Sequence, residues 1–233
     1  MRNNLGKTLC LIPAKGGSTR LARKNVLPLG GKPLLGWAVD AAAQSGLMDH
    51  IVVSTEDEQI AEVARTLGAD VPFMRPLHLA RDPAGVVDVA LHTLGELRNR
   101  GKEYQTLVIL LPTCPFRNAD DVRNACELFR ETNASFLMSV SRYEHTPFAA
   151  MSLDGERRLR PYFSEYIGKK SQEMPKAYRA NGAIHVLEVA AFERERSYYA
   201  QPLIGYEMPW QRSIDIDTEH DLRFAESLLG SAG

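Results

Sequence analysis

The sequence predicts an α/β fold, with a doubly wound and mostly parallel sheet interrupted by one inserted segment. Short apolar runs alternate with amphipathic segments of helical length, which is the rhythm of strands and their covering helices. The runs are apolar along their whole length, as is typical of strands buried on both faces. The alternation stops after Tyr143 and resumes near Asn181. Residues 144–178 are therefore expected to form an insertion in a single domain that spans residues 1–233.

Each strand and helix is expected from the local pattern. Strands are expected at residues 8–12, 50–55, 70–74, 106–111, 135–143, 181–189 and 203–209. Helices are expected at residues 33–46, 57–68, 85–101, 118–131, from about 190, and after Thr218. Gly46 and Gly68 suit helix ends, and Thr218 with Asp221 has the spacing of a capping box. Asp154-Gly155 indicates a hairpin within the insertion.

The composition is that of an ordinary globular protein and excludes several function classes. The 233 residues are 44% hydrophobic and carry a net charge of -1, so no overall field attracts nucleic acid or a membrane surface. No stretch approaches the roughly 20 apolar residues of a membrane span, and the first apolar run is too short for a signal peptide. The three cysteines fit neither a disulfide framework nor a metal knuckle. We therefore expect a protein of the reducing cytoplasm.

A basic, glycine-containing loop follows the first expected strand, where ligands bind in open α/β sheets. Residues 11–25 read LIPAKGGSTRLARKN and contain four cations and no acidic residue: Lys15, Arg20, Arg23 and Lys24. The glycines and Ser18 can turn backbone N–H groups towards an oxygen-rich ligand. The pattern favours a polyphosphate, although neither GxxxxGK[ST] nor GxGxxG is present. The alternative is a surface loop with solvated side chains.

Two aspartates near the C-terminus indicate a metal site. In SIDIDT, residues 213–218, Asp215 and Asp217 would share one face of an expected strand, while Ile214 and Ile216 would face the core. Two carboxylates suit Mg²⁺, which takes one or two of them together with substrate phosphates. The alternative is a polar strand face on which Asp217 helps to cap the next helix.

Six collinear blocks resemble the acylneuraminate cytidylyltransferases, the family that makes CMP-sialic acid and related CMP-nonulosonates. The first block, LIPAKGGSTRLARKNV, is similar to the family's usual opening I-P-A-R-G-G-S-K-x-[IL]-P-x-K-N. The other five are GKPLLGWAV, VVSTEDEQIAEVARTLGADVPFMRP, LLPTCPFRNADDV, YRANGAIHV and SIDIDTEHDL, in the family's order and at similar spacing. The resemblance covers nearly the whole chain and implies a Rossmann-like nucleotidyltransferase sheet.

The resemblance also implies a reaction, the Mg²⁺-dependent transfer of CMP from CTP to the anomeric hydroxyl of a nine-carbon α-keto acid sugar, with release of pyrophosphate. It implies that the catalytic residues are Lys15, Lys24 and Arg117. The implied nucleotide-binding residues are Ala14, Lys15, Gly16, Gly17, Ser18, Lys24, Asn25, Arg75, Asp82, Pro112 and Thr113. The implied sugar-binding residues are Leu111, Arg179, Asn181, His185, Tyr198 and Tyr199. The implied metal ligands are Asp215 and Asp217.

Departures from the family pattern cluster on the sugar side. Leu111 stands where a glutamine is usual, and His185 replaces a common tyrosine. Ala149 and Ser171 stand where some sialate-specific members carry lysine and arginine. On the nucleotide side, Lys15 replaces an arginine and lacks its planar fork. The resemblance therefore implies CTP with an acceptor other than plain N-acetylneuraminate, and the NGAI block is more similar to the sialate and legionaminate branch than to the pseudaminate branch.

The insertion at residues 144–178 corresponds, by resemblance, to the family's dimerisation arm, so a homodimer is expected. Burial against a partner subunit would explain the apolar residues Phe148, Tyr162, Phe163, Tyr166 and Met174. The alternative is an arm that folds back on its own domain. Two other functions stay open. One is a related nucleotidyltransferase acting on 3-deoxy-octulosonate or a sugar 1-phosphate, and the other is a catalytically inactive nucleotide-binding homologue.

Overall fold

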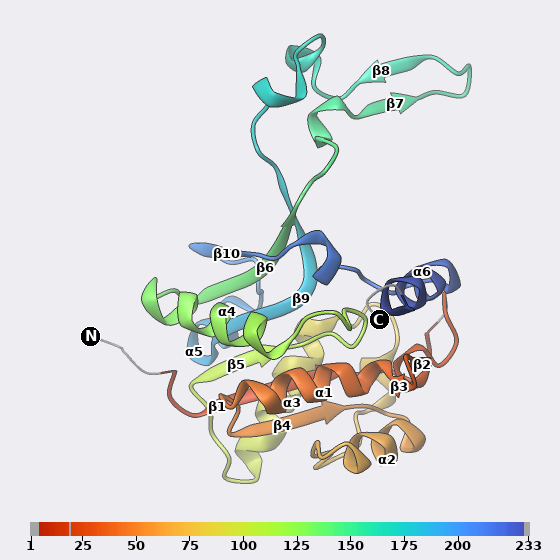
Figure 1. Ribbon diagram of the computed structural model, residues 1–233. Coiled ribbons are helices and arrows are strands. Elements are labelled where there is room, and N and C mark those ends of the chain that lie inside the picture. Colours follow the sequence, from red (N-terminus) through yellow and green to blue (C-terminus); the bar gives the residue numbers. More distant parts are fainter. Residues whose placement is uncertain (1–4, 19, 231–233) are drawn as a thin grey trace.

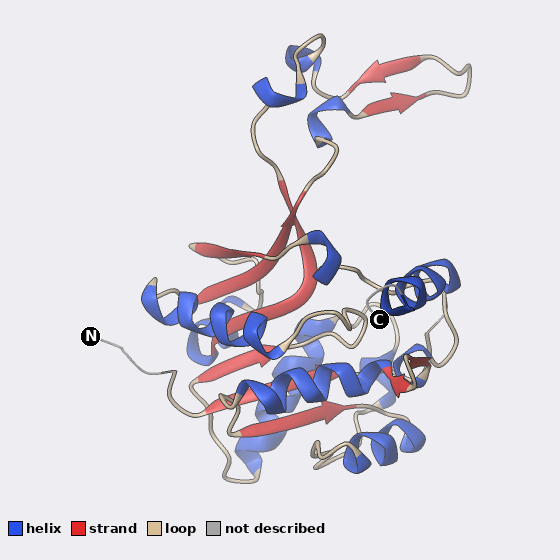
Figure 2. Ribbon diagram, in the orientation of Figure 1, coloured by secondary structure: helices blue, strands red, loops and turns tan. Residues whose placement is uncertain are grey.

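The computed structural model describes residues 5–18 and 20–230, which are built around one six-stranded sheet (Figures 1 and 2). The strand order is β10 (Leu203–Glu207), β6 (Phe136–Arg142), β9 (Tyr178–Glu188), β5 (Thr106–Ile109), β1 (Thr8–Pro13) and β4 (His50–Ser54). Of these six strands, β9 alone runs antiparallel to its neighbours, β5 and β6. The mostly parallel sheet expected from the apolar runs is confirmed.

Helices cover both faces of the sheet. One face carries α1 (Leu34–Ser45), α2 (Glu58–Thr66) and α4 (Ala119–Glu131), and the other carries α3 (Val86–Asn99) and α5 (Val189–Glu195). The side chains of β1 alternate between these layers, because Cys10 and Ile12 join the first core cluster and Leu9 and Leu11 the second. All four are fully buried, which explains why the strand is apolar along its whole length. None of the described helices combines the length and the apolar character needed to cross a membrane.

The expected helix ends lie close to the observed ones. Gly46 follows α1 with a φ of 71°, a left-handed conformation that glycine adopts without strain. The Asp57 carboxylate caps α2 by accepting from the backbone N–H of Ile60 at 3.0 Å. Helix α6 (Glu219–Gly230) begins with the expected capping box, in which the Asp221 carboxylate accepts from the Thr218 N–H at 2.8 Å.

Two expected strands are wrong. Residues 70–74 contribute only a bridge between Asp70 and Val52, because Pro72 has no N–H with which to continue a ladder. Residues 213–218 form no strand, because their backbone divides its hydrogen bonds between two other segments. The Ile216 N–H donates to the carbonyl of Thr113 at 2.8 Å, and the Asp217 N–H donates to a side chain of α6. Ile216 is nevertheless buried, as expected.

A small second core places the C-terminal helix beside the loop that follows β1. Strands β2 (Pro28–Leu29) and β3 (Lys32–Pro33) form a hairpin, and Leu29, Leu34, Ile216 and Ala225 pack together as a buried cluster. The cluster joins the hairpin, α1, α6 and the 213–218 segment. It therefore fixes the aspartate-bearing segment against the start of the chain.

The insertion stands away from the domain as an extended arm (Figure 1). It leaves the sheet where Arg142 pairs with Tyr178, and it contains the hairpin of β7 (Met151–Leu153) and β8 (Leu159–Pro161). None of residues 142–180 is buried. The expected hairpin is confirmed, and the alternative of an arm folded back on its own domain is wrong.

Aromatic side chains give the arm a small core of its own. The Phe148 ring lies 5.4 Å from the Phe163 ring and 4.7 Å from the Tyr166 ring, measured between centroids. These three residues are half-buried, whereas Tyr162 is exposed. The arm therefore has internal packing but leaves part of its apolar surface uncovered.

Candidate active site

Four segments meet at the carboxyl-terminal edge of the parallel strands. They are the loop 14–27 after β1, residues 55–57 after β4, residues 110–118 after β5, and residues 213–218 before α6. Hydrogen bonds join them, including one from the Gly16 N–H to the Glu56 carboxylate at 2.7 Å. This is the edge at which ligands bind in open α/β sheets. The basic loop and the aspartate pair, which lie far apart in the sequence, thus come together.

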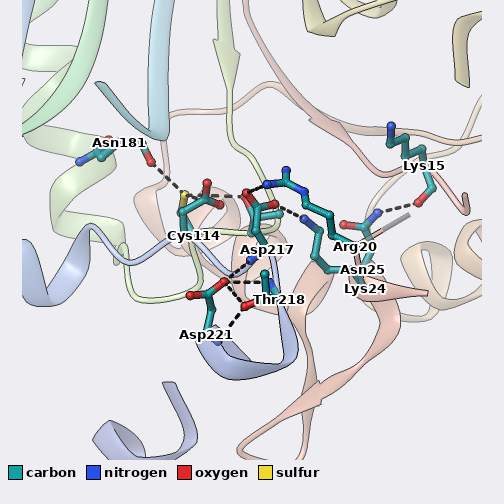
Figure 3. A network of polar contacts seen from close by, with 11 residues as sticks. Lys15, Arg20, Lys24, Asn25, Cys114, Asn181, Asp217, Thr218 and Asp221 are labelled. Atoms are coloured by element: carbon teal, nitrogen blue, oxygen red, sulfur yellow. Dashed lines mark hydrogen bonds and ion pairs between the residues drawn. The ribbon is translucent and has the colours of Figure 1, made fainter. Parts of the chain in front are cut away.

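Asp217 lies between two cations of the basic loop (Figure 3). The Lys24 ammonium is 2.7 Å from Oδ1 of Asp217, and the Arg20 guanidinium is 2.8 Å from Oδ2. Lys24 is mostly buried, while the Arg20 side chain is 65% exposed. Arg20 and Lys24 balance the charges of Asp217 and the neighbouring Asp215, and the exposed Lys15 of the same loop adds a further positive charge that favours an anionic ligand.

Asp215 lies beside this cluster and is exposed to solvent. Partial loss of water around the carboxyl, together with the negative charge of Asp217, raises the pKa of Asp215. A divalent cation bound by both aspartates would relieve this repulsion. Among residues 5–18 and 20–230, no group of three or more His, Cys, Asp or Glu side chains could hold a metal. The pair fits Mg²⁺, whose remaining ligands would be phosphate oxygens and water.

Contacts of Asn25 and Gly16 fix the backbone of the basic loop. The Asn25 side chain is buried and donates to the carbonyl of Lys15 at 2.8 Å, which leaves the Lys15 side chain exposed. At Gly16 a Cβ atom would lie 2.8 Å from the Asp57 carboxylate, so this position requires glycine for close packing. At Gly17 a Cβ atom would meet no atom within 4 Å, so the backbone there is open to a ligand. Gly17 is therefore the better placed of the two for phosphate contact.

Two acidic residues that the sequence analysis did not single out hold the site together. The Glu56 carboxylate accepts from the Gly16 N–H and from the Arg75 guanidinium at 2.6 Å, and these bonds lower its pKa despite the opposing effect of burial. Asp57 pairs with both terminal nitrogens of Arg23 at 3.1 Å. Arg23 is thus engaged in structure. The only signal in the sequence was an acidic pair directly after a strand, which equally suits a helix start.

The remaining nucleotide-side residues lie along the same edge, with different exposure. Ala14 and Pro112 are buried, so they shape the backbone of the site. Thr113 is half-buried, and its carbonyl accepts from the Ile216 N–H at 2.8 Å. Ser18 is also half-buried, and its N–H donates to the Gly16 carbonyl at 3.1 Å. Asp82 is exposed on the loop before α3, and no described contact joins it to the others.

Arg117 lies beneath the loop that follows β5. Its guanidinium is buried, with 2% of the residue exposed, and Nη1 donates to the carbonyls of Leu111 at 2.9 Å and Cys114 at 2.8 Å. Burial lowers the pKa of Arg117, and its Nε and Nη2 have no hydrogen-bond partner in the described structure. Arg117 therefore holds the loop after β5 in place, and its expected catalytic role stays a prediction.

Asn181 is likewise part of an internal network. Its side-chain oxygen accepts from the Ser139 hydroxyl at 2.6 Å, and its amide nitrogen donates to the Ser213 hydroxyl at 2.9 Å. Its backbone carbonyl accepts a hydrogen bond from the Cys114 thiol at 3.2 Å, as Figure 3 shows. These bonds hold β9 to β6 and to the aspartate-bearing segment, so Asn181 positions the site through its neighbours.

The other sugar-side residues fall on two faces of the sheet. The rings of His185, Tyr198 and Tyr199 form an aromatic row in which neighbouring rings are tilted, with centroid distances of 4.7 and 4.9 Å. A bulge in β9 then changes the register: His185 pairs with Met138 but Arg179 pairs with Ser141. Residues 138 and 141 face opposite sides of β6, so Arg179 lies on the other face from the aromatic row.

Burial leaves two of these residues in apolar surroundings. The Nδ1 atom of His185 has no described partner, and burial lowers the pKa of this imidazole to about 4. Leu111 is half-buried and packs against the same core cluster as Tyr198. The histidine is therefore neutral at ordinary pH, and this part of the site is apolar.

Comparisons with known proteins agree with this geometry. A family model described as cytidylyltransferase matches residues 9–228. The pseudaminic acid cytidylyltransferase of Campylobacter jejuni subsp. jejuni serotype O:2 is 32% identical over 222 residues, which are 95% of this chain and 96% of that protein. The CMP-N,N'-diacetyllegionaminic acid synthase of Legionella pneumophila subsp. pneumophila is 34% identical over 225 residues, which are 96% of each.

A solved structure supports the fold independently. The structure of CMP:2-keto-3-deoxy-manno-octonic acid synthetase complexed with CTP superimposes with a TM-score of 0.71, covering 97% of this chain and 100% of that one at 16% identity. At this identity the likeness concerns the fold alone. Because the family model spans nearly the whole chain, and both relatives exceed 30% identity over almost their full length, the protein belongs to the cytidylyltransferase family.

Proposed function

We propose that the protein transfers CMP from CTP to the anomeric hydroxyl of a nonulosonic acid and releases pyrophosphate. The observation that carries this proposal is the contact of Lys24 and Arg20 with Asp217, which joins a phosphate-binding surface to a pair of potential metal ligands. Two relatives are named for pseudaminic and legionaminic acids, and this supports the acceptor class.

The reaction exchanges one bond for another. The anomeric oxygen forms a bond to the α-phosphorus of CTP, the bond from that phosphorus to the β-phosphate oxygen breaks, and pyrophosphate leaves with the electron pair while the hydroxyl loses its proton. Charge accumulates on the phosphate oxygens, so alignment and neutralisation supply most of the catalysis. Lys15 and Lys24 would pair with these oxygens, and the Gly17 N–H would orient them. Asp215 and Asp217 would hold Mg²⁺, which supplies further positive charge when bound.

The acceptor side supports a sugar with acylamino substituents. The exposed Tyr199, backed by Tyr198 and the buried His185, offers an aromatic surface on which an acyl methyl group can pack. The identities to the pseudaminic and legionaminic relatives, 32% and 34%, are too similar to favour one of them. The preference for the legionaminate branch thus stays a prediction, and the acceptor proposed is a nonulosonic acid other than plain N-acetylneuraminate.

The arm supports the proposal that the working unit is a homodimer. Its exposed apolar side chains include Leu153 and Leu159, which are 64% and 62% exposed and pair across the hairpin. Apolar side chains gathered on a projecting element are typical of a protein–protein contact. A second copy of the chain offers the same arm, so a symmetric contact is the simplest partner.

The experiment that tests the function measures pyrophosphate release with CTP and Mg²⁺ against a panel of acids. The panel holds N-acetylneuraminic, legionaminic and pseudaminic acids and 3-deoxy-octulosonate, and a sugar 1-phosphate is assayed in parallel. Release is expected with one nonulosonic acid, absent with ATP or GTP, and abolished by a chelator until Mg²⁺ is restored. Release with 3-deoxy-octulosonate or the sugar 1-phosphate alone would establish the related nucleotidyltransferase instead. CTP binding without release from any acid would indicate the inactive homologue.

A further inference from the structure

The four cations of the basic loop differ in what holds them. Arg23 is fixed by two hydrogen bonds to Asp57, and these bonds raise its pKa. Lys24 is mostly buried and begins the short helix η1 (Lys24–Val26), next to the buried Asn25. Lys15 is exposed and has no ion pair with a described residue. Arg20 is the one cation of the loop that combines an exposed side chain with a contact to Asp217.

The Arg20 contact therefore has little to keep it in place. The only described ion pair of its guanidinium is with Asp217, at 2.8 Å, and the side chain is 65% exposed. An ion pair of this kind contributes little net stability, because water and salt screen the attraction and holding two side chains in one geometry costs conformational entropy. Lys24 would still neutralise Asp217 if Arg20 left it. Arg20 is thus free to move to a stronger anionic partner at small cost.

Binding of the proposed substrates changes the charges around Asp217. A divalent cation on Asp215 and Asp217 repels a guanidinium that sits on the same carboxylate. The triphosphate that arrives with it presents several pairs of non-bridging oxygens, which match the forked donors of arginine. Both changes favour the same movement, away from the carboxylate and onto phosphate.

We propose that Arg20 is a transferable cation, which neutralises Asp217 before substrate binds and pairs with phosphate oxygens of CTP or pyrophosphate once a metal ion takes its place. This inference rests on the proposed function and adds to it a residue with two successive partners. It predicts effects of opposite sign when Arg20 is removed. Without nucleotide the variant should bind metal more tightly, and with metal bound it should bind pyrophosphate more weakly.

The test compares wild type with Arg20→Ala, Arg20→Lys and the control Arg223→Ala. Arg223 is a good match for Arg20, because it is 69% exposed and pairs with a carboxylate, that of Glu219 on α6. The first readout is Mn²⁺ binding to the nucleotide-free protein, followed by the electron paramagnetic resonance of free Mn²⁺. The second is binding of inorganic pyrophosphate at saturating Mg²⁺, followed by calorimetry.

The expected outcome separates the variants in both readouts. Arg20→Ala should bind Mn²⁺ about five-fold more tightly than wild type and pyrophosphate about ten-fold more weakly. Arg20→Lys should keep the wild-type Mn²⁺ affinity and lose part of the pyrophosphate affinity, because it keeps the charge but not the fork. Unchanged or weaker Mn²⁺ binding by Arg20→Ala, or pyrophosphate affinity within two-fold of wild type, would overturn the proposal. Wild-type binding of CTP reports separately on the proposed function, so the two failures are distinguishable.

Discussion

The Lys24 ammonium lies 2.7 Å from the Asp217 carboxylate, although 193 positions of the sequence separate the two residues. The contact is made possible by the packing of Ile216 with Leu29 and Leu34, which brings the segment before α6 against the loop after β1. The basic loop after β1 and the carboxylate of Asp217 therefore form one site, although they come from opposite ends of the sequence.

Asp217→Asn should abolish turnover while leaving the fold intact. The amide keeps the shape but loses the charge that attracts Lys24, Arg20 and the proposed metal ion. We expect pyrophosphate release to fall by at least about 100-fold, because charge neutralisation supplies most of the catalysis of phosphoryl transfer. The free energy of unfolding should change by only about 1 kcal/mol, since the ion pairs are partly exposed. The measurements are pyrophosphate release and thermal unfolding followed by circular dichroism.

The matched control for this variant is Glu219→Gln, which neutralises an exposed carboxylate two positions away. It should behave as wild type in both measurements. Turnover by Asp217→Asn within a few-fold of wild type would contradict the metal assignment.

Arg117→Met should lower stability and, through the loop after β5, activity. The variant leaves the carbonyls of Leu111 and Cys114 without their buried donor. Unsatisfied buried groups of this kind cost about 1–3 kcal/mol each, while removal of a buried guanidinium with two unpartnered nitrogens offsets part of that cost. We therefore expect a net loss of about 2 kcal/mol and a drop in melting temperature of roughly 2–4 °C per kcal/mol. Denaturant unfolding and the kcat of pyrophosphate release are the measurements. A large loss of kcat at unchanged stability would instead restore Arg117 to direct contact with substrate.

The alternation of apolar runs with amphipathic segments was sufficient to predict the sheet and its helices, since apolar runs and capping residues act locally. It was insufficient for residues 213–218, where the order I-D-I-D has the period of a strand. Their hydrogen-bond partners, Thr113 and Asp221, belong to a loop and a helix, and no local pattern reports such partners. The strand assignment was wrong, yet the two features that it was meant to explain, a buried Ile216 and a polar Asp217, are both present.

The candidate site was predictable where residues act through an exposed charge and not where they act through buried bonds. Lys24 and Asp217 were expected to serve one site, and the structure brings them into contact. Glu56 was missed, because its role depends on the Gly16 N–H and on Arg75, which only the fold brings near. For Arg117 a sequence motif does not distinguish a residue that lines a site from one that supports it, and only the structure shows its bonds to the loop after β5.

The stability of the protein should fall on mild acidification through His185. The pKa of His185 is about 4 in the folded protein and 6.5 in the unfolded chain. Between these two pH values the unfolded chain therefore binds the proton more readily than the folded protein. The contribution of the neutral histidine is complete above pH 6.5 and is lost as the pH falls towards 4, by about 3 kcal/mol in all. The measurement is the free energy of unfolding of wild type and of His185→Phe from pH 7 to pH 4. Between pH 7 and pH 4 the free energy of unfolding of the wild type should fall by that amount relative to the variant. Parallel curves for the two proteins would contradict a buried neutral imidazole.

The arm should hold two chains together through its hairpin. Leu153 and Leu159 are paired neighbours whose exposed side chains add nothing to the core of the described chain. We expect wild type to have twice the 25.9 kDa chain mass in light scattering after gel filtration. The double variant Leu153→Asp with Leu159→Asp should have the mass of one chain, because two charges in an apolar contact are costly to bury.

The control for this pair is Arg160→Ala, which alters the neighbouring position of the same hairpin and should leave the mass unchanged. The melting temperature of the wild type should rise with protein concentration, because association stabilises the folded chain. The double variant should lose this concentration dependence and otherwise unfold as the wild-type domain does. A wild-type protein that is monomeric at micromolar concentration, or a double variant that keeps the wild-type mass, would remove the hairpin from the subunit contact.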